Sequence, residues 1–324
     1  MKLIGLCPVR NEDWLLGLSL RAMLMWMDEV IVLLHACSDR SEQICNEVER
    51  EYPGRVLVLK NSNPVWTEME HRTAMLQSAR ERGATHCAIL DADEILTADL
   101  LCRIGDVETI RGATDHAPRI RTLVKNLRPG QILRLPGYNL RGGIHRYHSN
   151  GIWGNREFST AFADAPGLGW YGDKHHSREP QGSSPVPTMI QQGAGGIVHL
   201  WGASERRLRA KHQSYRINDH LHFPDIPAHE LNLQYNLWRS PADCARKYPN
   251  QPQWHAPWEY KSVPTEWLDR YQPLMKYLDM NSVPYQEEYC RRLVAQYGRE
   301  RFAGIDLSNI DLPDAVTNAA VLAS

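Results

Sequence analysis

The amino-acid sequence predicts an α/β protein with a mostly parallel sheet flanked by helices. Over the first hundred residues, short apolar runs alternate with segments whose apolar residues recur at helical spacing. The short runs are continuously apolar, which is typical of strands covered on both faces. The chain has 324 residues, of which 42% are hydrophobic and 23% charged, so it is long enough for a well-buried core.

Predicted strands and helices follow one another in turn through this first part. The strands are expected at residues 3–7, 30–34, 56–59 and 87–90. The helices are expected at residues 12–27, about 41–51 and 67–82. Before the second helix, the segment Ser38-Asp39-Arg40-Ser41 supplies side chains that cap a helix N-terminus.

After about residue 105 the pattern changes, and Gly, Pro, Arg and aromatic residues are intermixed. Further strands are expected at residues 132–135, 158–162 and 196–200, with a loop over 180–196. Ser204 is a suitable cap for a basic helix that runs to about Arg216. Helical pieces and a weak tail follow. The sequence therefore predicts three parts, which are residues 1–104, 105–216 and a helical C-terminal extension over 217–324.

The strongest chemical signal is a pair of aspartates at the end of the fourth predicted strand. Asp91 and Asp93 directly follow an apolar run. Residues i and i+2 of an extended backbone point the same way, so both carboxylates can face one point at the carboxyl edge of the sheet. Two such charges repel each other unless a cation lies between them, and Mn²⁺ or Mg²⁺ prefers oxygen ligands. The alternative is a solvated turn that caps the next helix.

Bulk properties restrict the class of protein and its compartment. The formal net charge of -1 gives no general attraction to nucleic acid or anionic membrane. No apolar run approaches the roughly 20 residues that cross a bilayer, and the first residues do not form a signal peptide. The seven cysteines are scattered without a CxxC spacing, which favours free thiols in a reducing cytoplasm.

Four motifs in order resemble the GT-A glycosyltransferases, specifically the family-2-like group. They are Pro8-Val9-Arg10-Asn11-Glu12, Ser38-Asp39-Arg40-Ser41, His71-Arg72 and Leu90-Asp91-Ala92-Asp93-Glu94. The resemblance covers roughly residues 2–100 and continues more loosely to His199 and Trp201. It implies a nucleotide-sugar-binding half over residues 1–104 and an acceptor-binding half over 105–216, with a Rossmann-like GT-A sheet.

The resemblance also implies roles for individual residues. The donor is expected to be contacted by Pro8, Arg10, Glu12, Asp39, Arg72, Asp91 and Trp201. A Mn²⁺ or Mg²⁺ ion is expected to be bound by Asp93, Asp91 and His199. The implied activity is metal-dependent transfer of a sugar, such as a hexose, from a nucleotide-sugar donor, commonly a UDP-sugar, with inversion.

The chain departs from that family in three places. After the second strand it has His35-Ala36-Cys37-Ser38-Asp39 instead of the common acidic pair. It has no QxxRW motif, which argues against a processive synthase, and it lacks the Glu-Asp pair that supplies the base in inverting members. An inverting transfer needs a group that accepts the acceptor's proton. The candidates for this base are Asp173, Glu157 and His176.

Other readings of the sequence remain open at this stage. A nucleotidyltransferase on a related fold would have a Gly-rich loop after the first strand, where this chain has no glycine. A catalytically inactive module that binds glycan, peptide or nucleic acid is the alternative from another class. The acceptor is a glycan, a small molecule, a protein or a modified nucleic acid, the last kept open by an Arg-rich stretch over residues 119–146. The C-terminal part is expected to cover the acceptor or to form a homodimer contact.

Overall fold

The computed structural model describes residues 1–63, 67–101, 120–172, 178–187 and 190–311. Two compact units are each assembled from separate stretches of the chain. Unit 1 consists of Met1–Asn139, Asn155–Leu200 and Ser262–Met280. Unit 2 consists of Leu140–Gly154, Trp201–Lys261 and Asn281–Ser324. The division into residues 1–104, 105–216 and 217–324 stays a prediction.

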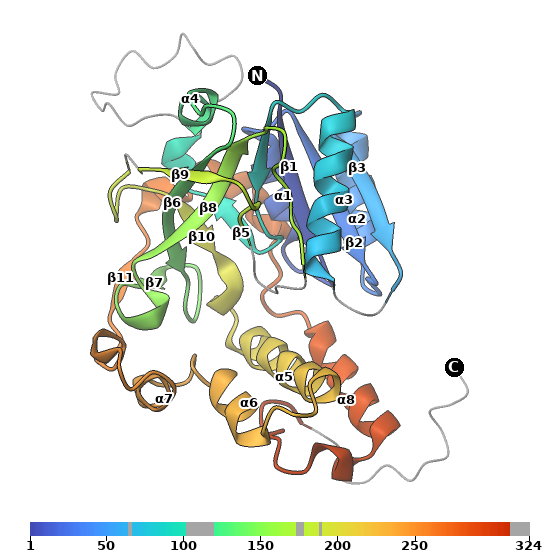
Figure 1. The fold of residues 1–324 in the computed structure, drawn as a ribbon, viewed down its shortest axis with the longest axis vertical. Helices are drawn as coiled ribbons and strands as arrows, with labels where there is room; N and C mark the ends of the chain where they lie inside the picture. Colours follow the sequence, from blue (N-terminus) through green and yellow to red (C-terminus); the bar gives the residue numbers. More distant parts are fainter. Residues whose placement is uncertain (64–66, 102–119, 173–177, 188–189, 312–324) are drawn as a thin grey trace. The chain divides into compact units, whose positions relative to one another are not determined.

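Unit 1 is built on a large, curled sheet (Figure 1). The strands of the chain are β1 (Leu3–Val9), β2 (Glu29–His35), β3 (Val56–Asn61), β4 (His86–Ile89), β5 (Glu94–Leu96), β6 (Gln131–Asn139), β7 (Arg146–His148), β8 (Arg156–Ala163), β9 (Ser184–Val186), β10 (Ile197–His199) and β11 (Tyr260–Ser262). In the described residues the sheet order is β3-β2-β1-β4-β8-β6-β10-β5, with β9 paired to β6. The β3-β2-β1-β4 half is entirely parallel, while β8 and β5 run antiparallel to their neighbours.

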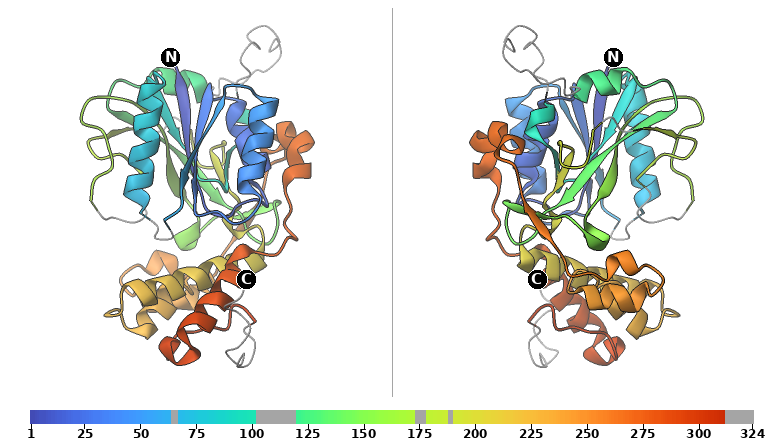
Figure 2. Two further views of the ribbon diagram at one scale, coloured as in Figure 1. Left: turned by 90° about the vertical axis from the view of Figure 1, so that its right-hand side faces the viewer. Right: turned by 90° about the vertical axis from the view of Figure 1, so that its left-hand side faces the viewer.

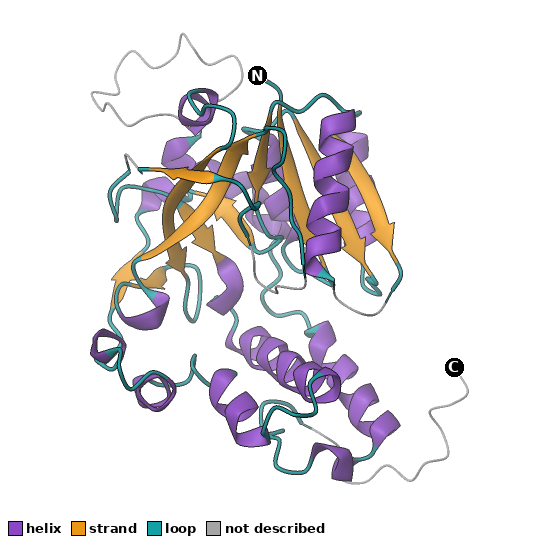
Figure 3. Ribbon diagram, in the orientation of Figure 1, coloured by secondary structure: helices purple, strands orange, loops and turns teal. Residues whose placement is uncertain are grey.

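Helices cover both faces of the parallel half (Figures 2 and 3). The α-helices are α1 (Leu16–Leu24), α2 (Ser41–Glu51), α3 (Glu68–Glu81), α4 (Ile120–Lys125), α5 (Glu205–His222), α6 (Ala228–Gln234), α7 (Pro241–Lys247) and α8 (Tyr285–Tyr297). The short 3-10 helices are η1 (Ala98–Leu100), η2 (Gly151–Trp153), η3 (Leu200–Gly202), η4 (Pro252–Trp254), η5 (Thr265–Trp267), η6 (Asp269–Tyr277) and η7 (Arg299–Phe302). Helix α3 lies on one face of the sheet, and α1 and α2 lie on the other (Figure 2).

This architecture confirms the predicted fold class, a mostly parallel α/β sheet flanked by helices, with helices following it in the C-terminal part. The continuous apolar runs of the sequence are the buried strands: every residue of β1 is buried, as are all but the first of β2. Met75 and Leu76 of α3 pack with Ile4 and Leu6 of β1 in one apolar cluster. The sequence signal was strong here because both faces of these strands are covered.

Helix α1 is shorter than the predicted 12–27. Residues before it form a turn in which the backbone N–H groups of Leu15 and Leu16 both donate to the carbonyl of Glu12, at 3.2 and 2.9 Å. Trp14 and Trp26 lie outside the helix but are still buried. Their burial continued the apolar pattern beyond the helix and made it look longer.

The stretch Ser262–Met280 completes the core of unit 1 from late in the sequence. The Trp267 ring lies 4.2 Å from that of Tyr138 in β6, and Trp267 is buried. The buried Tyr271 hydroxyl donates to the carbonyl of Leu96 at 2.6 Å. The Arg21 guanidinium of α1 stacks 3.8 Å from the Tyr277 ring. This stretch is therefore structurally part of unit 1.

Unit 2 is mainly helical and has a small two-stranded sheet of β7 and β11. One apolar cluster joins α5, α6 and α8, and includes Ile217, Leu231 and Cys290. Helix α5 begins after Ser204, as predicted, but continues to His222 instead of ending near Arg216. None of the helices described in either unit has the length and apolar character needed to cross a membrane. The cysteines of the described chain are all free thiols, and Cys102 lies outside it.

Candidate functional site

The acidic motif lies where three strand ends of unit 1 meet. Asp91 and Asp93 follow β4, which is parallel to β1, so the motif stands at the carboxyl edge of the parallel half. Strand β10 pairs antiparallel with β5, which sets His199 opposite Glu94. The same strand pairs parallel with β6, which sets His199 opposite Asn139. Sheet register therefore brings a histidine and an asparagine from distant parts of the sequence to the acidic motif.

Asp93 and His199 face each other across this edge. The Nε2 atom of His199 lies 3.4 Å from Oδ1 of Asp93, whose side chain is nearly buried. The other ring nitrogen, Nδ1, lies 2.8 Å from Oδ1 of Asn139. An amide oxygen only accepts hydrogen bonds, so Nδ1 carries the proton. In the neutral ring, Nε2 therefore points a lone pair toward the Asp93 carboxylate, as in a metal-ligating histidine oriented by a hydrogen bond from its other nitrogen.

Arg178 holds the acidic motif in place through Glu94 and the end of β4. Its guanidinium donates to both oxygens of Glu94 at 2.6 and 2.5 Å, and the Glu94 side chain is 1% exposed. It also donates to the carbonyls of Ile89 and Ser159, each at 2.7 Å. The second Glu94 oxygen accepts from the backbone N–H of Asp91 at 3.0 Å. Arg178 thus ties the end of β4, strand β8 and the motif together.

Asp91 lies between two arginines. Its carboxylate oxygens are 3.4 Å from the guanidinium of Arg72 and 3.5 Å from that of Arg178. Burial by itself would raise the pKa of Asp91, but the charges of Arg178 and Arg72 outweigh burial and lower it. Arg72 is in turn held by Glu68, one turn earlier in α3, at 2.9 Å. Asp91 is therefore kept ionised beside two cationic groups that can contact a phosphate.

The charges around the motif leave room for a cation. The carboxylates of Glu68, Asp91, Asp93 and Glu94 face the guanidinium groups of Arg72 and Arg178. Among these described side chains, four carboxylates stand beside two guanidinium groups, an excess of acidic groups that suits a divalent ion. No group of three or more His, Cys, Asp or Glu side chains in the described chain has the arrangement of a metal site. If a Mn²⁺ or Mg²⁺ ion binds at this edge, Asp93 and His199 would be ligands supplied by the described chain.

The loops that follow β1 and β2 are bound to each other. Asn11 has a left-handed backbone with φ of 55°, and its side-chain oxygen accepts from the N–H groups of Ser38 and Asp39 at 2.7 and 3.1 Å. The Asp39 carboxylate accepts from the N–H groups of Asp13 and Ser41, both at 2.9 Å. Burial raises the pKa of Asp39 despite these bonds. Both of its oxygens are engaged in shaping the loop.

Of the other residues predicted to contact the donor, Arg10 and Glu12 lie on the loop after β1, while Pro8 and Trp201 do not. Pro8 is buried in β1, and Arg10 is half-buried just after it. The buried Glu12 accepts from the Trp14 indole at 2.6 Å. Trp201 belongs to unit 2, where its ring lies 4.7 Å from that of Trp153.

Two buried histidines stand beside this region at the ends of β2 and α3. The rings of His35 and His71 lie 4.6 Å apart. Burial, together with the nearby His35 and Arg10, lowers the pKa of His71 to about 4, so this ring is neutral at pH 7. Asn61 at the end of β3 lies 3.0 Å from Nε2 of His71. These polar side chains come from the ends of β2 and β3 and from the first turn of α3.

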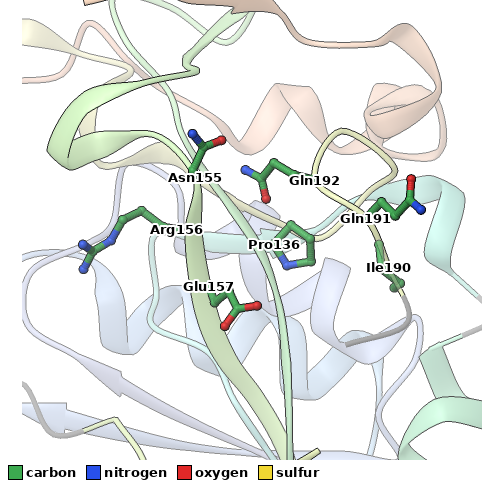
Figure 4. Close-up of a pocket in the computed structure, with 7 residues that line it drawn as sticks. All are labelled: Pro136, Asn155, Arg156, Glu157, Ile190, Gln191 and Gln192. Atoms are coloured by element: carbon green, nitrogen blue, oxygen red, sulfur yellow. The ribbon is translucent and has the colours of Figure 1, made fainter. Parts of the chain in front are cut away.

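None of the three candidates for the catalytic base is placed beside the acidic motif by the described residues. Asp173 and His176 lie outside the described residues. Glu157 is exposed and pairs with Pro136 in the β6–β8 ladder. Its neighbour Phe158 places its ring 5.7 Å from that of His199, and successive side chains of a strand point to opposite faces. Glu157 therefore lines a different hollow, of about 640 Å³, together with Pro136 and Gln191 (Figure 4).

Sequence reasoning missed three residues that shape the site: Asn139, Arg178 and, as an anchored group, Glu94. Glu94 is part of the recognised motif, but no role was assigned to it from the sequence. Asn139 and Arg178 carry no local signal, because each acts through a contact 60 to 84 residues away along the chain.

Comparison with protein-family models found no match, and comparison with curated proteins found none either. Comparison with solved structures found several likenesses. S. aureus TarS 1-349 in complex with UDP is 10% identical over 94% of this chain and 83% of that one, with a TM-score of 0.40. The mannosyltransferase PcManGT from Pyrobaculum calidifontis, in complex with GDP-Man and Mn²⁺, is 19% identical over 29% of this chain and 28% of that one, with a TM-score of 0.24.

A third likeness is the glucosyl-3-phosphoglycerate synthase from Mycobacterium tuberculosis in complex with Mg²⁺ and UDP. It is 16% identical over 29% of this chain and 34% of that one, with a TM-score of 0.23. The chain spans 17% of the length of another TarS structure, to which it is 19% identical with a TM-score of 0.26. The chain is thus similar, at low identity, to proteins whose structures were solved with UDP or GDP-mannose.

Proposed function

We propose that the chain is a metal-dependent glycosyltransferase that uses a nucleotide-sugar donor. The observation that carries this proposal is the Asp93–His199 pair, a carboxylate oxygen and a ring nitrogen 3.4 Å apart at the carboxyl edge of the sheet. Neighbouring ligands of an octahedral Mg²⁺ or Mn²⁺ stand about 3 Å apart when each is roughly 2.1 Å from the ion. The GT-A-like motifs of the sequence support the same reading.

The chain's own residues have distinct tasks in this proposal. Asp93 and His199 hold the ion, and Asn139 keeps the His199 ring in the tautomer that leaves Nε2 available. Arg178 holds the motif rigid through Glu94. When bound, the cation supplies positive charge that stabilises the departing diphosphate. Asp91 is proposed as a further ligand or a donor contact.

The donor pocket is proposed to extend from the motif to the joined loops after β1 and β2. Arg10 and Arg72 supply positive charge there, and Pro8, Glu12 and Asp39 line or shape the loops. A UDP-sugar that transfers a hexose with inversion is the first donor to test. Asp173, Glu157 and His176 remain the proposed bases, and Trp201 a proposed donor contact. A cytoplasmic location, a glycan, small-molecule, protein or nucleic-acid acceptor and a homodimer stay predictions.

The test is a panel of UDP-, GDP- and dTDP-sugars with and without Mn²⁺, read by thermal shift and by release of nucleoside diphosphate. We expect at least one donor to stabilise the protein only when Mn²⁺ is present. Asp93→Ala should abolish this shift. His199→Asn should lower the affinity for Mn²⁺ about tenfold or more, and so reduce the shift at a given Mn²⁺ concentration. The surface variant Asp225→Ala is the control and should behave as the wild type.

Binding of Mn²⁺ itself, followed by calorimetry, separates loss of the metal from loss of the donor. Equal Mn²⁺ affinity in the wild type and in Asp93→Ala would refute the metal site. A donor that binds with Mn²⁺ but is never hydrolysed or transferred would instead favour the inactive binding module.

A further inference from the structure

Unit 2 contains an arginine with no acidic partner. The guanidinium of Arg141 lies 5.2 Å from the centre of the Trp238 ring, and no carboxylate in the described chain lies within ion-pair distance of it. Its NH1 atom is buried without a hydrogen-bond acceptor among the described residues. Burial lowers the pKa of Arg141, which means that the charged form is held in an unfavourable environment. A half-buried cation of this kind is normally paired.

The neighbouring charged residues do not supply Arg141 with a free carboxylate. Arg146 donates through Nε to the carbonyl of Arg141 at 2.8 Å, so the two arginines are adjacent in one hairpin. The nearest acidic influence on Arg141 is Glu205, but its carboxylate is bound by Arg209 at 2.8 Å. Among the described residues, Arg146 and Arg209 therefore act against the charge of Arg141, and Glu205 acts in its favour.

Two ring nitrogens beside the hairpin also have no hydrogen-bond partner among the described residues. His148 is 1% exposed, and its Nδ1 atom has no hydrogen-bond partner in the described chain. The indole nitrogen of Trp258 is likewise buried without a partner there. The two rings meet edge to face at 5.3 Å. Leaving the buried indole N–H without an acceptor costs about 1–3 kcal/mol, so such a group calls for a water, an ion or a ligand as its partner.

Aromatic rings connect these donors to the arginines. The Tyr260 ring lies 4.8 Å from that of His148 and 4.9 Å from the Arg146 guanidinium. Tyr260 is 39% exposed, so a ligand can reach it. Burial, with Arg141 and Arg146 nearby, lowers the pKa of His148 to about 4, which keeps this ring neutral at pH 7. The positive charge of the cluster therefore comes from the arginines.

We propose that Arg141, Arg146, His148, Trp258 and Tyr260 form a binding site for an oxyanion, a phosphate or a carboxylate, carried on a sugar-like ligand. Guanidinium groups match both anions because each can donate two parallel hydrogen bonds to them. The indole N–H supplies a further donor, the imidazole Nδ1 a further polar atom, and the exposed tyrosine offers a face for a ring. The site lies wholly in unit 2, and its ligand class does not depend on the proposed transferase activity.

The test is titration calorimetry of the full chain at 50 mM and 200 mM NaCl. The probes are inorganic phosphate, glucose 6-phosphate, glucuronate and glucose. We expect at least one of the three anions to bind, more weakly at the higher salt, and glucose not to bind detectably. Binding of the phosphate probes without glucuronate would identify a phosphate ligand, and the reverse a carboxylate ligand.

Arg141→Gln should weaken anion binding tenfold or more. Arg246→Gln is the matched control, because Arg246 is an exposed arginine of the same unit that is paired with Asp243. Anion binding that is unchanged in Arg141→Gln would overturn the proposal, as would the absence of heat from all three anions up to 20 mM.

A second measurement remains decisive if Arg141→Gln folds poorly. The indole N–H resonance of Trp258, assigned with Trp258→Phe, should shift when phosphate or glucuronate is added to the wild type. A resonance that stays in place while the anion binds elsewhere would place the ligand outside this site and refute the assignment.

Discussion

Removing Arg178 should destabilise unit 1 more than removing any exposed arginine. In Arg178→Met, the Glu94 carboxylate loses both of its charge-assisted bonds while its side chain remains 1% exposed. The carbonyls of Ile89 and Ser159 lose a donor as well. The methionine has a similar length but cannot donate a hydrogen bond, so the change removes interactions without leaving a large hole.

The magnitude follows from the burial of the partners. Breaking a buried ion pair by removing one member costs about 3–5 kcal/mol, because the other charge stays in the interior. Each lost bond to a backbone carbonyl adds roughly 1 kcal/mol, reduced where water enters beside the partly exposed position of Arg178. We therefore expect a loss of about 4 kcal/mol in the free energy of unfolding. The double variant Arg178→Met/Glu94→Gln should recover about half of this loss, because a neutral amide is less costly to bury.

Arg80 provides a matched control. It also makes a two-bond ion pair, with Asp164 at 2.8 and 2.8 Å, but its side chain is 40% exposed. Arg80→Met should therefore cost only about 1 kcal/mol. The assay is urea unfolding at pH 7.5, followed by far-UV circular dichroism and tryptophan fluorescence together. A cost of Arg178→Met that is no greater than that of Arg80→Met would refute the reasoning.

Two further predictions concern stability. Gly196→Ala should lower the free energy of unfolding in urea by about 3 kcal/mol or more. The reason is that Gly196 has φ of 152° and a Cβ there would lie 2.0 Å from the Pro136 carbonyl oxygen. A loss below about 1 kcal/mol would show that β6 and β10 can separate easily. The second concerns Asp306 in unit 2, where burial alone would raise the pKa, but bonds from Ser308 and the charges of Arg216 and Arg239 lower it to about 2. Because this pKa lies below the unfolded value of about 3.9, the carboxylate stabilises the folded chain above pH ~4. The stabilisation is on the order of 1–2 kcal/mol, since the group is partly exposed. It is lost as the pH falls from about 4 to 2. The difference in unfolding free energy between wild type and Asp306→Asn should shrink over that range, and a difference that does not change with pH would contradict the assignment.

The first half of the fold was predictable because its signals are local. Strands β1 to β4 are continuous apolar runs, and the acidic motif directly follows β4. The later strands were located only in part: β6 runs over Gln131–Asn139 and β8 over Arg156–Ala163, beyond the predicted 132–135 and 158–162. Both extend through polar or special residues such as Pro136, which weaken the sequence pattern.

Four short strands of the described chain, β5, β7, β9 and β11, were not predicted, and β5 and β9 show why. Strand β5 contains Glu94, which the pattern assigns to the motif, and β9 lies within Gly-, Pro- and Ser-rich residues that look like a loop. Each has only three residues, too few for a periodic signal.

The candidate site was predictable to the extent that it follows a strand end. Asp91 and Asp93 were found from their spacing, and His199 from its place at the end of a late apolar run. Arg178 and Asn139 were not, because long-range pairing alone gives them their role. The same limit applies to Arg141, which looks in the sequence like one basic residue among many.

Late residues complete an early core in this chain, and this matters for synthesis on the ribosome. Trp267 and Tyr271 contact β6 and the end of β5, which are made 129 and 175 residues earlier. While the ribosome is still translating the region before Ser262, the nascent sheet is unfinished, and its apolar surface beside helix α1 is uncovered. We therefore expect premature termination products that stop between residues 217 and 261 to aggregate or to be captured by chaperones, although they already contain every residue of the acidic motif.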